Sequence, residues 1–465
     1  MSDSLSEKAE GGIVAKALGH RERMRSKTDR RRFLAKMVAT TAASLAWTLD
    51  SPADTPSRFH PGSPVGPEDE SYWTRVRAQF AFEPNLIYFN NASLGVPPRS
   101  VTQAVAEGYR RLAANPAVAK LELADYLAST LRPAVARLLG ADADEIAVTR
   151  GASESLYLIA NGFDLAPGDE VLMTSQEHPA GLSPWQMRAE RTGVVVRQAP
   201  IPSPFVDEHE VVKLIERAFT SKTKVLLFCH VTRGGLRYPV KELCELARQR
   251  GVLSAVDGAQ AVGVMPVDVH ALGCDLYANS LHKWSLAPAG NGVLYVRKEI
   301  QGRFRSLFSS AGADAARYEP IGTSPLPLRL AAGDALKFIA QIGVPNIEAR
   351  AQMLSDMLAS KLARVPRLKV ISPTSRAIRS PAITLFEIEG LNAVETQALI
   401  QKKYRITVDE HTRDGHNALR VSTHFYNTRR EIDQLITALH EIVGSGQSKR
   451  SAGLEQPRSH HSHHG

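Results

Sequence analysis

The sequence predicts an α/β fold built on a mostly parallel seven-stranded sheet, with a smaller C-terminal α+β domain. Seven apolar runs of strand length recur between residues 146 and 297, and several are continuously apolar, as expected of strands buried on both faces. Helix-like segments such as 153–160 and 240–250 separate many of the runs, an alternation that is typical of a parallel sheet. From about residue 330 the pattern changes, which indicates a second domain.

The expected strands of the large domain are short and rich in Val, Ile and Leu. They cover 146–149, 171–174, 193–197, 225–230, 252–257, 275–279 and 293–297. Together with an N-terminal segment, they place this domain at residues 71–325.

The second domain is expected at 326–445 and mixes long helices with short strands. Its first elements are helical stretches at 330–342 and 347–362 and strand-like pieces at 382–388 and 418–422. A closing helix over 428–443 begins with Thr428 and carries Glu431 three residues later. This spacing predicts a capping box, in which each residue satisfies a backbone N–H of the other.

The first 53 residues resemble a twin-arginine export signal. Arg30 and Arg31 precede Phe33, and a mildly apolar stretch follows over 37–49. The resemblance implies the twin-arginine export machinery as a partner and a periplasmic or secreted destination. The alternative is a disordered basic leader before a short amphipathic helix, in a protein that stays in the cytoplasm.

Residues at both ends are expected to lie outside the fold. The segment 54–70 is rich in Pro and Gly and is typical of a linker. The polar tail 446–465 contains four histidines, so we expect a disordered segment that is functionally silent, weakly metal-binding or an added tag.

Charge and cysteine usage exclude several classes of protein. The formal charge is +9, but residues 1–36 carry +5 of it and residues 446–465 carry +2, which leaves +2 for the body. No nucleic-acid footprint is therefore expected, and no apolar stretch is long enough to predict a membrane-spanning helix. The three cysteines Cys229, Cys244 and Cys274 fit neither a zinc site nor a disulfide framework, so we expect buried free thiols and no metal.

Polar groups follow four of the predicted strands, at the sheet edge where open α/β sheets bind ligands. They lie in the segments 150–154, 177–179, 257–260 and 279–284. Each has an ordinary explanation on its own: Ser153 or Asp257 as a helix cap, His178 as a loop residue, Lys283 as a surface lysine. A lysine this close to an apolar strand can also be desolvated, which favours its neutral, nucleophilic form.

The order and spacing of these groups resemble the class V aminotransferase family of fold-type I pyridoxal-phosphate (PLP) enzymes. The diagnostic parts are the Ser-x-His-Lys run at 280–283, the Asp-x-Ala-Gln run at 257–260 and Glu-His-Pro at 177–179. The family includes cysteine desulfurases and isopenicillin N epimerase-like proteins, and the resemblance covers roughly residues 85–440. It implies the fold-type I PLP-dependent transferase fold and pyridoxal 5'-phosphate as the cofactor.

The resemblance also implies roles around the cofactor. Lys283 would hold it as a Schiff base and later move the substrate's Cα proton, Asp257 would keep the pyridine nitrogen protonated, and His178 would stack on the ring. Gln260 would lie near the ring's 3'-oxygen. The expected phosphate ligands are Ala152, Ser153, Ser280, His282 and, from the neighbouring subunit of a homodimer, Thr323.

Three residues are expected at the substrate. Arg420 would clamp an α-carboxylate, and Asn91 belongs to a segment that resembles the border of the substrate pocket. Arg233 stands about where relatives carry an asparagine, and it points either inward or to solvent. The loop 411–418, where desulfurases carry their nucleophilic cysteine, contains none, which argues against desulfurase activity because that chemistry needs a thiolate.

The predicted function is therefore a PLP-dependent transformation of a small-molecule amino acid or primary amine, either transamination or Cα epimerisation. One alternative is a periplasmic lyase or oxidative decarboxylase that tailors a secreted peptide such as a siderophore. An alternative of another class is a non-catalytic amine-binding protein on a PLP fold. The presence of Lys283, Asp257 and His178 together counts against it, because a binding module has little need of all three.

Overall fold

The computed structural model describes residues 62, 66–205, 207–307, 314–319 and 322–452, with side chains to residue 444. The expected export signal lies outside the described residues, as do residues 453–465. The described residues belong to one compact unit, so the expected boundary between residues 325 and 326 stays a prediction. No helix in the described ranges is long and apolar enough to cross a membrane.

The central sheet has seven strands, all within two residues of the expected positions. They are β2 (Ile146–Thr149), β3 (Glu170–Thr174), β4 (Val195–Ala199), β5 (Thr223–Cys229), β6 (Leu253–Asp257), β7 (Leu276–Ser280) and β8 (Gly292–Val296). Their order is β2-β8-β7-β6-β5-β3-β4, and β8 runs in the direction opposite to the other six strands. The mostly parallel seven-stranded sheet is confirmed.

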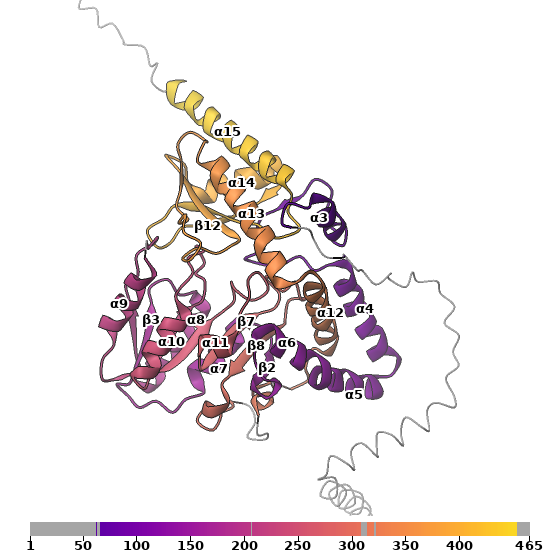
Figure 1. The fold of residues 1–465 in the computed structure, drawn as a ribbon, viewed down its shortest axis with the longest axis vertical. Helices are drawn as coiled ribbons and strands as arrows, with labels where there is room; N and C mark the ends of the chain where they lie inside the picture. The colour runs from indigo at the N-terminus through magenta and orange to yellow at the C-terminus, as the bar shows by residue number, and fades with distance from the viewer. Residues whose placement is uncertain (1–61, 63–65, 206, 308–313, 320–321, 453–465) are drawn as a thin grey trace, which may run out of the picture. The chain divides into compact units, whose positions relative to one another are not determined.

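Helices cover both faces of this sheet (Figure 1). In β5, Val225 and Leu227 pack with one layer, while Leu226 and Phe228 pack with the other, because side chains alternate along a strand. The first layer contains α7 (Ala152–Asn161) and α8 (Pro179–Thr192). The second contains α6 (Arg132–Leu139), α9 (Glu208–Ala218), α10 (Val240–Gln249), α11 (Val269–Leu272) and α12 (Leu326–Ile342). Burial on both faces explains the unbroken apolar runs of the sequence.

Two helices before the sheet complete the second layer. They are α4 (Arg99–Ala114) and α5 (Pro116–Tyr126), followed by a π-helical turn over Leu127–Leu131. The helix α4 packs along α12, and Gly108 permits close contact because a Cβ there would lie 2.8 Å from Pro327.

The C-terminal part is built on an antiparallel sheet of order β12-β13-β10-β9. Its strands are β9 (Leu368–Val370), β10 (Ile383–Ile388), β12 (Asp409–His411) and β13 (Ala418–Ser422). Apolar residues of α13 (Val344–Leu362), α14 (Ala393–Tyr404) and α15 (Arg429–Ala452) pack with it (Figure 1). A short parallel pair, β1 (Ile87–Tyr88) with β11 (Ile406–Thr407), joins the N-terminal segment to this part.

The last helix shows the expected cap and one difference. The Thr428 hydroxyl accepts a hydrogen bond from the Glu431 backbone, and the Glu431 carboxylate accepts one from the Thr428 N–H. The predicted capping box is therefore present. The helix α15 continues to Ala452, so residues 446–452, which we expected in a disordered tail, are helical.

The N-terminal helix α3 (Glu70–Arg77) is anchored on the C-terminal part. The guanidinium of Arg350, on α13, is fully buried; it donates to the Glu70 carboxylate and to the carbonyl oxygens of Pro67 and Asn427. It also lies over the Trp73 ring, 5.6 Å from the centroid. Glu70, expected to end the linker, is therefore part of the fold.

Candidate active site

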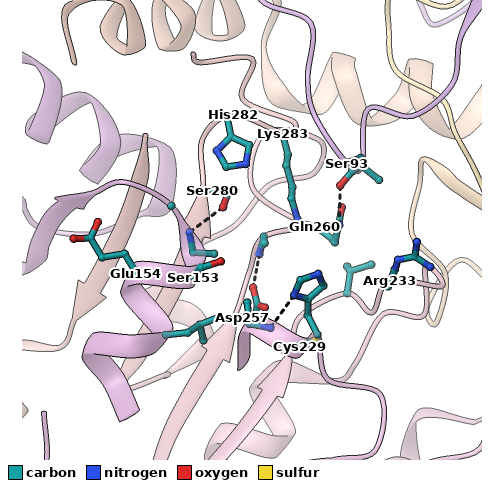
Figure 2. A pocket seen from close by; sticks show the side chains of 18 of the residues that line it. Ser93, Ser153, Glu154, Cys229, Arg233, Asp257, Gln260, Ser280, His282 and Lys283 are labelled. Atoms are coloured by element: carbon teal, nitrogen blue, oxygen red, sulfur yellow. Dashed lines mark hydrogen bonds between the residues drawn. The ribbon is translucent and has the colours of Figure 1, made fainter. Parts of the chain in front are cut away.

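A cavity of about 680 Å³ lies at the carboxyl ends of the central strands (Figure 2). Asp257 ends β6, Ser280 ends β7 and Cys229 ends β5, and all three line it. The predicted site residues that the fold brings together here are Ala152, Ser153, His178, Arg233, Asp257, Gln260, Ser280, His282, Lys283 and Arg420. Asn91 and Thr323 are not among the lining residues.

The amine of Lys283 and the carboxylate of Asp257 face the same cavity (Figure 2). No salt bridge or hydrogen bond involves the Lys283 amine among the described residues. Burial lowers the pKa of Lys283, and the nearby Asp257 carboxylate opposes this effect. A lysine with a lowered pKa and no fixed carboxylate partner is available as a nucleophile and a base.

The Asp257 carboxylate is buried, and the protein donates a hydrogen bond to only one of its two oxygens among the described residues. One oxygen accepts a hydrogen bond from the Ala259 N–H at 3.0 Å, and within the described part of the chain the other has no protein donor. Burial raises the pKa of Asp257, while Lys283 and the Ala259 N–H lower it. A buried carboxylate with a free oxygen calls for a cationic or N–H partner in the cavity.

The N-terminus of α7 forms another part of the cavity wall. The Ser280 hydroxyl accepts a hydrogen bond from the Ala152 N–H at 2.8 Å, which ties β7 to the first turn of the helix. Gly292 of β8 permits this approach, since a Cβ there would lie 2.3 Å from Gly151 Cα. The buried Nδ1 of His282 has no partner among the described residues. Free N–H groups, a hydroxyl and an imidazole suit an anion such as a phosphate.

His178 begins α8 and is held in a defined orientation. Its Nδ1 accepts a hydrogen bond from the Ala180 N–H at 3.1 Å, so in the neutral ring the proton resides on Nε2. Burial and the positive charge of Lys283 lower the pKa of His178 to about 4. At neutral pH the cavity therefore presents an uncharged imidazole, as a stacking role requires.

Sequence reasoning missed the pair formed by Glu177 and Cys229. The Cys229 backbone N–H and its thiol both donate to the Glu177 carboxyl group, at 3.2 and 3.0 Å, and the Thr174 hydroxyl donates to it as well. Burial raises the pKa of Glu177 to about 7 and raises that of the Cys229 thiol well above its usual range. Cys229 is a buried free thiol, as expected, but it also lines the cavity.

Gln260 and Asn91 hold the backbone around Lys283. The Gln260 amide donates to the Ala92 carbonyl at 3.0 Å and accepts from the Trp284 indole at 2.9 Å. Asn91 is fully buried; it donates to the Lys283 carbonyl at 3.3 Å and accepts from the Tyr426 hydroxyl at 2.7 Å. The structure therefore places Asn91 behind the lysine and outside the cavity lining, with both ends of its amide hydrogen-bonded inside the protein.

Two arginines and an aspartate form the remaining wall. Arg420 is 2% exposed, and its guanidinium forms an ion pair with Asp409. Arg233 points inward, one of the two orientations left open above; it binds Asp409 at 3.1 Å and Glu410 at 3.2 Å. Burial lowers the pKa of Arg420 to about 10, although Asp409 opposes this. Asp409 was not predicted, because nothing in its sequence context marks the short strand β12.

The amino-acid sequence of this chain is similar to those of several known proteins. The sequence profile of the family described as Aminotransferase class-V matches residues 87–435. An isopenicillin N epimerase of Amycolatopsis lactamdurans is 32% identical over 398 residues, 80% of this chain and 98% of the relative. A probable cysteine desulfurase of Streptomyces coelicolor is 31% identical over 389 residues, 77% of this chain and 92% of the relative.

Solved structures agree on the fold. A cysteine desulfurase of Thermococcus onnurineus superposes with a TM-score of 0.72 at 26% identity, covering 80% of this chain and 98% of that one. A cysteine desulfurase of Escherichia coli gives a TM-score of 0.71 at 25% identity, covering 80% and 98%. The predicted fold-type I architecture is confirmed by these neighbours.

Proposed function

Because this chain belongs to the class V aminotransferase family, we propose that it is a PLP-dependent enzyme that transaminates an amino acid or primary amine, or epimerises it at Cα. The observation that carries the proposal is the amine of Lys283. It faces the cavity without a carboxylate partner among the described residues. The same cavity contains the carboxylate of Asp257, one oxygen of which accepts no hydrogen bond from the described part of the protein. A binding module would have no need of an unpaired nucleophile beside a buried charge.

The cavity residues fit PLP, the cofactor of this family. Lys283 would hold its aldehyde carbon, the free oxygen of Asp257 would face the pyridine N–H, and the α7 N-terminus with Ser153, Ser280 and His282 would hold the phosphate. The His282 nitrogen that lacks a partner and the Asp257 oxygen that lacks a donor are what such a ligand would satisfy. When bound, PLP supplies a carbonyl that joins the substrate nitrogen and a ring that withdraws electrons from Cα.

Three residues of this chain would then have separate roles in the reaction. Lys283, with its lowered pKa, takes the proton from the substrate Cα. Asp257 would keep a proton on the pyridine nitrogen, and His178, which is uncharged at neutral pH, would cover a face of the ring without adding charge. Transamination and epimerisation share this step and differ in whether the proton returns to Cα. Epimerisation is supported by two relatives named isopenicillin N epimerase, from Amycolatopsis lactamdurans and Streptomyces clavuligerus.

Desulfurase activity is not proposed, although several relatives bear that name. The loop 411–418 contains no cysteine, and Cys229 is the one cysteine of the chain that lines the cavity. Its thiol is buried, hydrogen-bonded to Glu177 and raised in pKa, so it stays protonated. A persulfide-forming enzyme needs a thiolate nucleophile.

We further propose a homodimer and twin-arginine export. The dimer is supported by the family and by Thr323, which is exposed and does not line the cavity of its own chain, as expected of a residue that serves a neighbouring subunit. Export is supported by Arg30 and Arg31 in their sequence context. Gel filtration with light scattering tests the dimer. Fractionation of cells that carry Arg30→Lys with Arg31→Lys tests the export.

The catalytic proposal is tested by incubating the PLP-loaded protein in D₂O with a panel of amino acids and amines, without an acceptor and with either a keto acid or an aldehyde as acceptor. A carbonyl product formed with the acceptor shows transamination, and deuterium at an inverted Cα shows epimerisation. Lys283→Ala should lose both reactions, whereas the control Lys298→Ala, which alters an exposed lysine paired with Asp144, should keep them. Turnover retained by Lys283→Ala would refute the assignment.

A further inference from the structure

The guanidinium of Arg420 has protein acceptors on both terminal nitrogens. Nη1 donates to the Arg233 carbonyl at 3.4 Å, and Nη2 donates to Asn90 at 3.2 Å and to the Asp409 carboxylate. An arginine that awaits a substrate carboxylate offers both terminal N–H groups as a fork. Here a carboxylate of the chain itself already occupies one arm of the fork.

The sheet fixes Asp409 in this place. Strands β12 and β13 pair in antiparallel register with Asp409 directly opposite Arg420, so the two side chains leave the same face of the sheet as neighbours. The second oxygen of Asp409 accepts from the Glu410 N–H at 3.1 Å, which holds the carboxylate from behind. The contact is therefore built into the strand pairing and does not depend on the rotamer of an exposed side chain.

The charges on this wall are already balanced. Arg233 and Arg420 face Asp409 and Glu410, two guanidinium groups against two carboxylates. A substrate carboxylate placed on Arg420 would add a third negative charge beside Asp409, in a site where both arginines are partly or fully buried. Like charges a few ångströms apart in such a site repel strongly.

We propose that Asp409 makes this cavity select primary amines whose amine-bearing carbon carries no carboxylate. The inference rests on the proposed function, since it concerns the substrate that reacts at Lys283. Asp409 covers Arg420, so a neutral substituent on the amine carbon can lie against the paired charges without displacing either. A substrate with an α-carboxylate must first separate Asp409 from Arg420 and leave it without that partner.

The neighbouring residue provides a matched control. Glu410 lies on the same strand and pairs with Arg233, but it makes no contact with Arg420 among the described residues. Glu410→Gln therefore removes one negative charge from the same wall and leaves the Asp409–Arg420 pair intact. Asp409→Asn removes the charge from the pair itself and keeps the size of the side chain.

The test compares amines with their carboxylated counterparts, using the purified full-length protein loaded with PLP. Suitable pairs are butylamine with norvaline and 2-phenylethylamine with phenylalanine, with both enantiomers of each amino acid. Dissociation constants come from the change in cofactor absorbance on binding and from calorimetry. Neither readout depends on turnover.

We expect the wild-type protein and Glu410→Gln to bind each amine about tenfold or more tightly than its amino acid. Asp409→Asn should bind the amino acids about tenfold more tightly than the wild type does, with little change for the amines. Tighter binding of the amino acids by the wild-type protein would overturn the inference and leave the proposed function standing. That comparison needs no variant to fold, and a protein that binds neither class would overturn both proposals.

Discussion

Replacing Glu177 by Gln should remove a pH-dependent cost of folding. The Glu177 carboxyl group is buried and has a pKa of about 7, against an ordinary value of 4.5. Because the folded pKa lies above the unfolded one, the folded chain holds the proton more tightly, and the group loses stability as the pH rises through this interval. Gln cannot ionise, yet its carbonyl oxygen can accept from Thr174 and from the Cys229 N–H, as Glu177 does.

The size of the effect follows from the two pKa values. Each pH unit between them corresponds to about 1.4 kcal/mol, so the full cost of ionising Glu177 in the folded protein is about 3 kcal/mol. Linkage places roughly 2.5 kcal/mol of this between pH 5 and pH 8. Unfolding about 400 residues has an entropy of about 0.8 kcal/mol/K, so the difference in melting temperature between variant and wild type should change by about 3 °C.

Melting curves of both proteins at pH 5, 6, 7 and 8 measure this quantity. The melting temperature of Glu177→Gln relative to the wild type should rise steadily with pH. Glu190→Gln, which alters an exposed side chain on α8, should follow the wild type at every pH. A difference between Glu177→Gln and wild type that is constant from pH 5 to pH 8 would show that Glu177 does not hold a proton near neutrality.

Two further substitutions test the support of the site. Asp257→Asn keeps the acceptor for the Ala259 N–H, so the protein should fold, but turnover should fall about 10²-fold or more because the charge beside the pyridine nitrogen is gone; near wild-type kcat would contradict the electronic role. Gly95→Ala would place a Cβ 2.0 Å from the Lys283 carbonyl oxygen, so the loop that carries the lysine must move. We expect this variant to lose about 1–3 kcal/mol of stability and to bind PLP less tightly, as measured by melting and cofactor titration, whereas Gly302→Ala, where the space is open, should do neither.

The strands of the central sheet could be predicted from the sequence because the burial of each strand shows in the apolar pattern of its own residues. A strand such as β5 is buried on both faces over most of its length, and the last five of its seven residues are apolar. The reversed direction of β8 was not predictable in this way, since an apolar run has the same pattern in either direction. The helices α4 and α5 were not foreseen either, because the residue pattern before 146 gave no strand to alternate with.

Some residues of the site could be predicted from the sequence in the same way, and others could not. Asp257, Ser280 and Lys283 follow strands, and the carboxyl ends of neighbouring parallel strands meet at one edge, so their proximity could be predicted. Asp409 could not be found, because it reaches the cavity only through the antiparallel register of two short strands. The expected segment around Asn91 does border the cavity, but through Ala92 and Ser93, because a shift of one residue decides which side chain faces in.

The walls of the cavity come from parts of the chain that are far apart in the sequence, and this determines when the cavity can close during synthesis. The Ala92 N–H is bonded to the Ser422 hydroxyl, 330 positions later, and β1 pairs with β11. Lys283 precedes Ser422 by 139 residues, and a ribosome that adds about 5–20 residues per second needs roughly 7–28 s for that distance. During this interval the nascent chain contains Lys283 but lacks the β13 contacts that close the pocket around it. Closure of the pocket must therefore follow the synthesis of β13, and a polypeptide truncated before β13 should accumulate without PLP.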